Sequence, residues 1–185
     1  MLTAGTIVTP ISDHQSSQLV FGIAVLGLSV TLAKHQVIGS PPTETSFSSF
    51  VGAFGIIVSV LGLASLWIDR IPVFVVMSAD ALLSIFYLAG GIALAIALKG
   101  VGSCTDNSSV SIAQRFTNSI LNGGCTDHGC YVGGGDGDYS QLTSRCQRAQ
   151  ADYVIEFIGF VVALIGLALA WLVHKQGGGS SRSYV

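Results

Sequence analysis

Four long apolar stretches run along this chain, each ending at charged residues, and one long polar segment separates the last two. Roughly 20 apolar residues cross the ~30 Å hydrocarbon layer of a membrane as a helix, which satisfies its own backbone hydrogen bonds there. The pattern predicts four spanning helices with approximate bounds 16–35, 47–68, 71–98 and 146–174. We therefore expect an all-α fold, a four-transmembrane-helix bundle with an extramembrane loop between helices 3 and 4.

The connections indicate a single domain, expected over 1–176. Helices 2 and 3 meet at Ile68-Asp69-Arg70-Ile71-Pro72, which is short enough to make them an antiparallel hairpin. The long loop covers 99–145, and a glycine- and serine-rich tail, 177–185, is expected to be flexible. The segment Met1–Ser17 lacks periodicity and is expected to lie along the membrane interface or to be disordered.

Composition supports a membrane protein. Half of the residues, 50%, are apolar and only 10% are charged, whereas a soluble domain carries about 25% charged residues. Four apolar helices of this length would leave too few polar residues to cover a soluble core. The first apolar stretch lacks the positively charged start of a signal peptide, so we expect it to remain as a membrane anchor.

All four cysteines lie in the polar segment between the last two apolar stretches. An even number confined to one segment is typical of disulfides formed in an oxidising compartment. Cys104 and Cys146 lie near the two membrane ends of the loop and are expected to pair, while Cys125 and Cys130 are close enough to pair locally. The alternative is a zinc site of Cys125, His128 and Cys130, whose spacing lacks the C-x₂-C pair of structural zinc.

The orientation rests on opposing signals. The cysteines favour an extracellular loop and cytoplasmic termini, and Asn107-Ser108-Ser109, an N-glycosylation acceptor, agrees. The Lys/Arg rule favours the reverse, because the loop side carries more basic residues than the side of the termini. We place both termini in the cytoplasm.

The loop is expected to contain an amphipathic helix over Ser109–Leu121 that caps the bundle. Its apolar residues are Val110, Ile112, Phe116, Ile120 and Leu121. The glycine-rich run 133–138 follows no strand, so we expect an exposed turn there and no phosphate-binding loop.

Asp80 lies within the third apolar stretch, where a carboxylate costs about 2.5–3.5 kcal/mol on insertion scales. We expect it to face the bundle interior as a hydrogen-bonding group, with a proton or ion relay as the alternative. We expect no second ionisable residue at mid-membrane, and we place Glu156 near the outer interface, within reach of water. The expected partners of Asp80 are Ser29, Thr31, Ser59 or Ser65.

Small residues recur at a spacing that lets helix backbones approach closely. Some of them are expected to pack within the bundle and others to contact proteins or lipids. The three motifs are Gly55-x₃-Ser59, Gly159-x₃-Ala163 and Gly166-x₃-Ala170.

Two segments of the chain resemble a known family. They are Ala79-Asp80-Ala81-Leu82-Leu83 with Phe86 and Ala89-Gly90, leading on to Ser103-Cys104 and Asn107, and Ser144-Arg145-Cys146-Gln147-Arg148-Ala149-Gln150-Ala151. The family is the fungal tetraspan MARVEL-domain class, specifically the eisosome-associated non-classical export proteins. The resemblance implies a multi-pass plasma-membrane protein with cytoplasmic termini that organises lateral membrane compartments. It also implies that Cys104 and Cys146 are the shared pair and that Cys125 and Cys130 belong to an insertion. The basic tail of the family is nearly absent here.

No catalytic constellation is found, because the four histidines are scattered and the serines lack an elbow motif. We expect a non-enzymatic scaffold without cofactor or metal. Its expected partners are membrane lipids (sphingolipid or sterol), copies of itself or other membrane proteins, and not nucleic acid. The alternatives are proton, ion or small-solute transport using Asp80, and an accessory subunit of a larger membrane complex.

Overall fold

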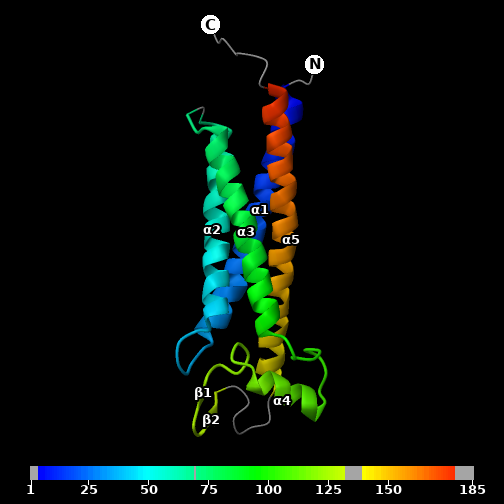
Figure 1. Ribbon diagram of the computed structural model, residues 1–185. Coiled ribbons are helices and arrows are strands. Elements are labelled where there is room, and N and C mark those ends of the chain that lie inside the picture. Colours follow the sequence, from blue (N-terminus) through cyan, green and yellow to red (C-terminus); the bar gives the residue numbers. More distant parts are fainter. Residues whose placement is uncertain (1–3, 69, 132–138, 178–185) are drawn as a thin grey trace.

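Four long helices run side by side in the computed structural model, which describes residues 4–68, 70–131 and 139–177 (Figure 1). They are α1 (Ala4–Lys34), α2 (Thr43–Ser65), α3 (Val73–Ala97) and α5 (Ser140–Gly177). A short helix and two short strands lie together at one end, which we call the cap: α4 (Ser109–Thr117), β1 (Cys125–Thr126) and β2 (Gly129–Cys130). The first turns of α1 and the last turns of α5 lie at the opposite end.

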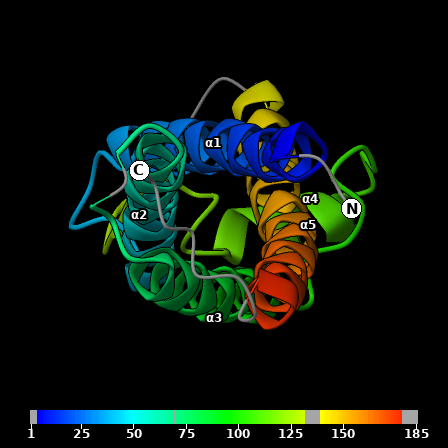
Figure 2. The same ribbon diagram turned by 90° about the horizontal axis from the view of Figure 1, so that it is seen from above.

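The long helices form a square bundle. Seen along its axis, α1 packs against α2 and α5, and α3 packs against the same two neighbours (Figure 2). Four helical segments are long and apolar enough to cross a membrane: Ser12–Lys34, Thr43–Ser65, Val73–Ala97 and Ser140–Leu172. The prediction of an all-α fold with four membrane helices and a disulfide-bonded loop is confirmed.

Three helices begin earlier than the hydrophobic pattern indicates, and one of them is α2, which starts at Thr43 rather than near 47. Helix α1 starts at Ala4 rather than near 16, so the expectation of an interfacial or disordered N-terminal segment is wrong from Ala4 onward. Helix α5 starts at Ser140 rather than near 146, because no glycine or proline interrupts the chain between Ser140 and the membrane. The flexible tail was predicted at 177–185, but Gly177 is the last residue of α5. The rest of that tail, 178–185, and the glycine-rich turn predicted at 133–138 lie outside the described residues.

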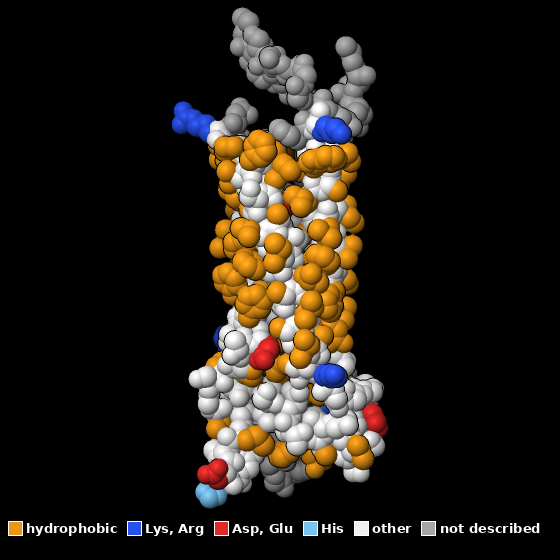
Figure 3. All heavy atoms as spheres, viewed as in Figure 1, with side chains coloured by type: hydrophobic (Ala, Val, Ile, Leu, Met, Phe, Trp, Pro, Cys, Tyr) orange, Lys and Arg blue, Asp and Glu red, His pale blue; other side chains and the backbone are white. Residues whose placement is uncertain are grey.

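The membrane-facing surface is apolar over the whole length of the helices. Figure 3 shows apolar side chains covering the shaft, with the charged side chains on this face near its two ends. Among the outward side chains, Val20, Ile57 and Ile96 are 63%, 64% and 66% exposed. This surface suits hydrocarbon, because lipid is as apolar as these side chains.

Small residues bring the helices into contact inside the bundle. A Cβ built on Gly22 of α1 would lie 2.9 Å from the backbone nitrogen of Ile56 in α2, so these two backbones touch. Of the predicted packing residues, Gly55 and Gly159 lie against Tyr87, and Gly166 lies against His14. Ser59 and Ala163 are fully buried, whereas Ala170 is half-buried.

The cap encloses an apolar cluster around one of the two disulfides. The structure pairs Cys104 with Cys146 and Cys125 with Cys130. The Cys104–Cys146 bond lies among buried side chains of the bundle end and the loop: Leu32, Leu94, Leu98, Ile120, Leu121 and Leu142.

Helix α4 is shorter than the predicted Ser109–Leu121. It ends at Thr117 because the side chain of Asn118 bonds the backbone instead, accepting from the amide of Ile120 at 3.0 Å and donating to Ala97 at 2.7 Å. Ile120 is buried as expected, but Val110 is 66% exposed and points away from the bundle.

Candidate functional site

Asp80 lies inside the bundle, where it is 3% exposed. The side chain of Gln15 in α1 donates to its Oδ2 at 3.4 Å. Gln18, one turn further along α1, also approaches this carboxyl group, although not at full hydrogen-bond geometry. The carboxyl group is therefore held between α1 and α3 by amide side chains.

The serine and threonine partners predicted for Asp80 bond elsewhere. Ser59 and Thr31 each donate to the backbone carbonyl four residues earlier in their own helix, at 2.7 and 2.6 Å. Ser65 bonds the carbonyl of Gly62, and Ser29 bonds Asp152. The prediction was wrong because a hydroxyl within a helix readily bonds its own backbone.

Two further carboxyl groups are buried in the bundle, near the cap. Asp152 and Glu156 of α5 are both fully buried, so the expectation that Glu156 reaches water near the interface is wrong. The hydroxyl of Ser29 donates to Oδ2 of Asp152 at 2.7 Å. We call Asp152 and Glu156 the carboxyl pair.

Helix α5 carries both members of the pair. It runs unbroken from Ser140, so Asp152 lies well inside the helix. Residues four apart lie on one face of a helix, so Asp152 and Glu156 point the same way. The sequence analysis included Asp152 in the helix predicted over 146–174 but did not single it out, because Asp152 precedes the apolar stretch of that helix. The i, i+4 spacing of two acids on an unbroken helix was the available signal.

Glycine allows Glu156 to pack directly against α3. A Cβ built on Gly90 would lie 2.7 Å from each carboxylate oxygen of Glu156. Any other residue at position 90 would displace this carboxyl group. Gly90 therefore determines where Glu156 sits.

Tyr87 lies between the levels of Asp80 and the carboxyl pair. It is fully buried, its ring packs on Gly159, and its hydroxyl lies near Gly55. Among the described residues, several buried polar atoms in the bundle have no hydrogen-bond partner. These are Nε2 of His14, Oε1 of Gln15, both amide atoms of Gln18, Thr45 and Ser48 hydroxyls, Oδ1 of Asp80, the Tyr87 hydroxyl, Oδ1 of Asp152 and both carboxylate oxygens of Glu156.

Two arginines that sequence analysis counted as loop charges are buried in the cap. Arg115 is fully buried and donates to the backbone oxygens of Ser111, Cys104 and Asp106 and to the hydroxyl of Thr143. Its position on the buried face of an amphipathic helix was the missed signal.

Arg145 connects the cap to the bundle. It is 3% exposed and donates to the carbonyl oxygen of Ile120 at 2.6 Å and to that of Leu32 at 3.5 Å. Its guanidinium therefore bonds backbone oxygens of the loop and of α1.

The start of α4 is ordered by an acidic residue. The carboxylate of Asp106 accepts from the backbone N–H and the hydroxyl of Ser108, both at 2.9 Å. These hydrogen bonds lower the pKa of Asp106 below its ordinary value. Ser108 is the N-cap of α4 and accepts from the amide of Ser111 at 3.3 Å. The neighbouring Asn107 is exposed, and its glycosylation stays a prediction.

The zinc alternative does not fit this structure. Cys125 and Cys130 are bonded to each other across the β1–β2 pair, and His128 is exposed at its turn. Within residues 4–68, 70–131 and 139–177, no group of three or more His, Cys, Asp or Glu side chains could hold a metal ion.

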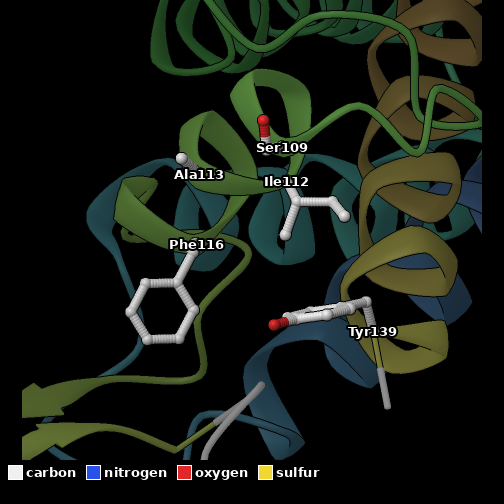
Figure 4. Close-up of a pocket in the computed structure, with 5 residues that line it drawn as sticks. All are labelled: Ser109, Ile112, Ala113, Phe116 and Tyr139. Carbon is white, nitrogen blue, oxygen red and sulfur yellow. The ribbon is translucent and has the colours of Figure 1, made fainter. Parts of the chain in front are cut away.

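A surface pocket of about 380 Å³ lies on the cap (Figure 4). It is lined by Ser109, Ile112, Ala113 and Phe116 of α4 and by Tyr139. In Figure 4 the side chain of Ile112 extends toward the ring of Tyr139, and the hydroxyl of Tyr139 points toward the side of the pocket where Phe116 lies. This lining offers apolar contacts and two hydroxyl groups, but no charged or metal-binding side chain.

Comparison with known proteins identifies one similarity. A family model described as MARVEL, a membrane-associating domain, matches residues 8–169. This range includes the four segments predicted to cross the membrane, apart from the last residues of α5, and the whole cap. No curated protein and no solved structure matches the chain.

Proposed function

Because the chain belongs to the MARVEL family of membrane-associating domains, we propose that it is a non-enzymatic organiser of lateral compartments in the plasma membrane. The chain is a multi-pass membrane protein with four apolar helices. In this proposal it acts as an eisosome-type scaffold of the non-classical export kind, with both termini in the cytoplasm and the cap outside.

The observation that carries the proposal is the separation of polar and apolar side chains across the bundle. Carboxyl and amide groups point inward, as Asp80, Gln18 and Glu156 do, while the outward side chains of the four helices are apolar. The outer surface can therefore contact lipid tails and other membrane helices. These are the contacts through which a membrane organiser works.

Helix α1 offers a place where another helix could approach closely. Gly27 is exposed, and a Cβ built on it would meet no atom within 4 Å. Val20 and Ile23, 63% and 54% exposed, lie on the same outer side. An outward glycine next to exposed apolar side chains suits close helix packing in lipid, because the backbones of two helices can then come into contact.

Clustering of a labelled protein in a bilayer tests the proposal. The full chain, reconstituted at low density in a sphingolipid- and sterol-containing bilayer, is expected to form clusters visible as multi-step photobleaching. Gly27→Leu should shift the population several-fold toward single molecules. Ala168→Leu, which adds the same side chain at an exposed position of α5, is the matched control. A wild-type protein that stays monomeric, or equal effects of the two variants, would contradict the proposal.

A second candidate function is proton or ion transport, which the buried carboxyl groups favour. Asp80, Tyr87 and Glu156 place ionisable groups at successive levels between the helices. Flux into liposomes that disappears in Asp80→Asn would support this function. Liposomes without flux would leave the organiser as the better explanation.

A further inference from the structure

We propose that the carboxyl pair, together with the hydroxyls of Ser29 and Ser48, forms a buried binding site for a hard metal cation. The site lies between the helices near the cap. It goes beyond the organiser function, which requires only the outer surface of the bundle, and beyond the sequence-based expectation of no metal.

The carboxyl pair places two acidic groups side by side inside the bundle. Asp152 and Glu156 are fully buried and lie one helical turn apart on α5. Oδ1 of Asp152 and both carboxylate oxygens of Glu156 have no hydrogen-bond partner among the described residues. Two neighbouring carboxylates in a low-dielectric interior are costly unless a cation or protons neutralise them.

The nearest buried cation on the same helix is already engaged. Arg145 lies two turns before Asp152, and its guanidinium donates to the backbone oxygens of Leu32 and Ile120. It therefore bonds the cap rather than the carboxyl pair. Neutralisation therefore comes either from protons or from a bound cation, and the two sources predict different responses to pH and to metal ions.

Hydroxyl groups from two other helices flank the pair. Ser48 of α2 approaches Glu156 without reaching hydrogen-bond geometry. Its side chain is fully buried, and its hydroxyl has no hydrogen-bond partner among the described residues. Ser29 of α1 bonds Asp152 at 2.7 Å. Helices α1, α2 and α5 thus contribute oxygen atoms, and α3 lies against Glu156 through Gly90.

The atoms available to coordinate a cation are all oxygens. Carboxylate and hydroxyl oxygens are hard ligands, which favour Na⁺, Ca²⁺ or Mg²⁺ over metals that prefer nitrogen or sulfur. The contact with Gly90 holds Glu156 in place, so its oxygens are positioned before a cation arrives. Two carboxylates match one divalent cation, or one monovalent cation and a proton. The experiment therefore compares Ca²⁺ with Na⁺.

Thermal unfolding of the full chain in lipid nanodiscs tests the site. After treatment with a chelator, Tm is measured at constant ionic strength in choline chloride, with Na⁺ or Ca²⁺ replacing choline in separate titrations. Since a ligand that binds only the folded state stabilises it, one cation should raise Tm by roughly 5–10 °C at about a hundredfold excess over its Kd, and the rise should saturate.

Two variants and a matched control assign the effect to this site. Glu156→Gln should abolish the cation-dependent rise, and Ser48→Ala should move its midpoint to higher cation concentration. Ser59→Ala removes another buried hydroxyl from α2, but one that bonds the carbonyl of Gly55, so it should leave the midpoint unchanged.

Several outcomes would overturn the site. They are a Tm that responds to neither cation, a Tm that responds to acidification alone, and an undiminished rise in Glu156→Gln. The wild-type titration and Ser48→Ala keep the test decisive even if Glu156→Gln does not fold.

Discussion

Arg115 shows how a single buried side chain can join three parts of the cap. Its guanidinium bonds the chain just after α3 at Cys104 and Asp106, its own helix at Ser111, and α5 at Thr143. A buried charge is tolerated here because it is surrounded by oxygen acceptors, which replace the lost water. The residue therefore maintains the cap, although its charge suggested a solvent-exposed loop position.

We expect Arg115→Met to lower the free energy of unfolding by roughly 2–4 kcal/mol, because buried carbonyl groups lose their donors. Denaturant-induced unfolding in bicelles measures the change. Arg148→Met, at a partly buried position of α5, removes the same charge and is the control. Equal losses in the two variants would mean that net charge, and not the hydrogen bonds of Arg115, stabilises the cap.

Asp106 predicts a pH dependence at the start of α4. Hydrogen bonds from Ser108 hold the pKa of Asp106 below its ordinary value. The stability that Asp106 contributes to the cap is therefore fully present above about pH 4, the ordinary pKa of an aspartate in the unfolded chain. It is lost as the pH falls through the lower pKa that Asp106 has in the folded protein. The carboxyl carbon of Asp106, followed by NMR, should titrate with a midpoint below about 3.9. A midpoint at or above that value would contradict the hydrogen bonds.

At the scale of single helices, the close contact between α1 and α2 depends on Gly52. A Cβ built on Gly52 would lie 2.8 Å from the Cα and 2.9 Å from the Cβ of Leu26, so the two helices touch through backbone. Gly27, one residue further along α1, has open space around it and faces outward. Glycine therefore serves packing inside the bundle at one position and remains free for outside contact at another.

We expect Gly52→Ala to destabilise the bundle by about 1–3 kcal/mol, since the added methyl group forces two backbones apart. Gly27→Ala should leave stability unchanged or raise it, because alanine favours helix and meets no neighbour. Both can be compared by thermal unfolding in the same nanodiscs. A Gly52→Ala protein as stable as Gly27→Ala would show that α1 and α2 are not in close contact.

At the scale of the whole molecule, the two ends of the bundle are held differently. At one end the cap joins α3 to α5 through the Cys104–Cys146 bond, whose cysteines are 42 residues apart in sequence. The Cys125–Cys130 bond closes a separation of only 5 residues within the β1–β2 pair. At the other end, α2 and α3 are joined by the short connection at 66–72.

A disulfide stabilises by limiting the unfolded chain, so the longer loop should contribute more. Replacing Cys104 and Cys146 together by serine is expected to cost up to about 4 kcal/mol, against about 2 kcal/mol for Cys125 and Cys130. Denaturant unfolding of the two double variants gives the comparison. A larger loss of stability in the Cys125 and Cys130 variant would contradict the prediction that the disulfide closing the longer loop stabilises the protein more.

Residue order alone determined the number of spanning helices, the short connection between α2 and α3, and the disulfide-bonded loop. These follow from local physics, because a backbone in lipid has to be helical and an apolar run shows its length directly. The inward position of Asp80 also follows from the sequence, because it is costly for a carboxyl group to face lipid.

Only the tertiary structure decided which polar groups meet. The partners of Asp80 are glutamines in a helical segment without apolar periodicity. The burial of Asp152 and Glu156 depends on the packing of α5 against Ser29 of α1 and Gly90 of α3, and that of Arg115 depends on how α4 lies across the bundle end. Each of these contacts joins residues far apart in sequence. Whether a polar side chain is solvated or enclosed depends on which helices pack beside it, and that information is absent from its local sequence.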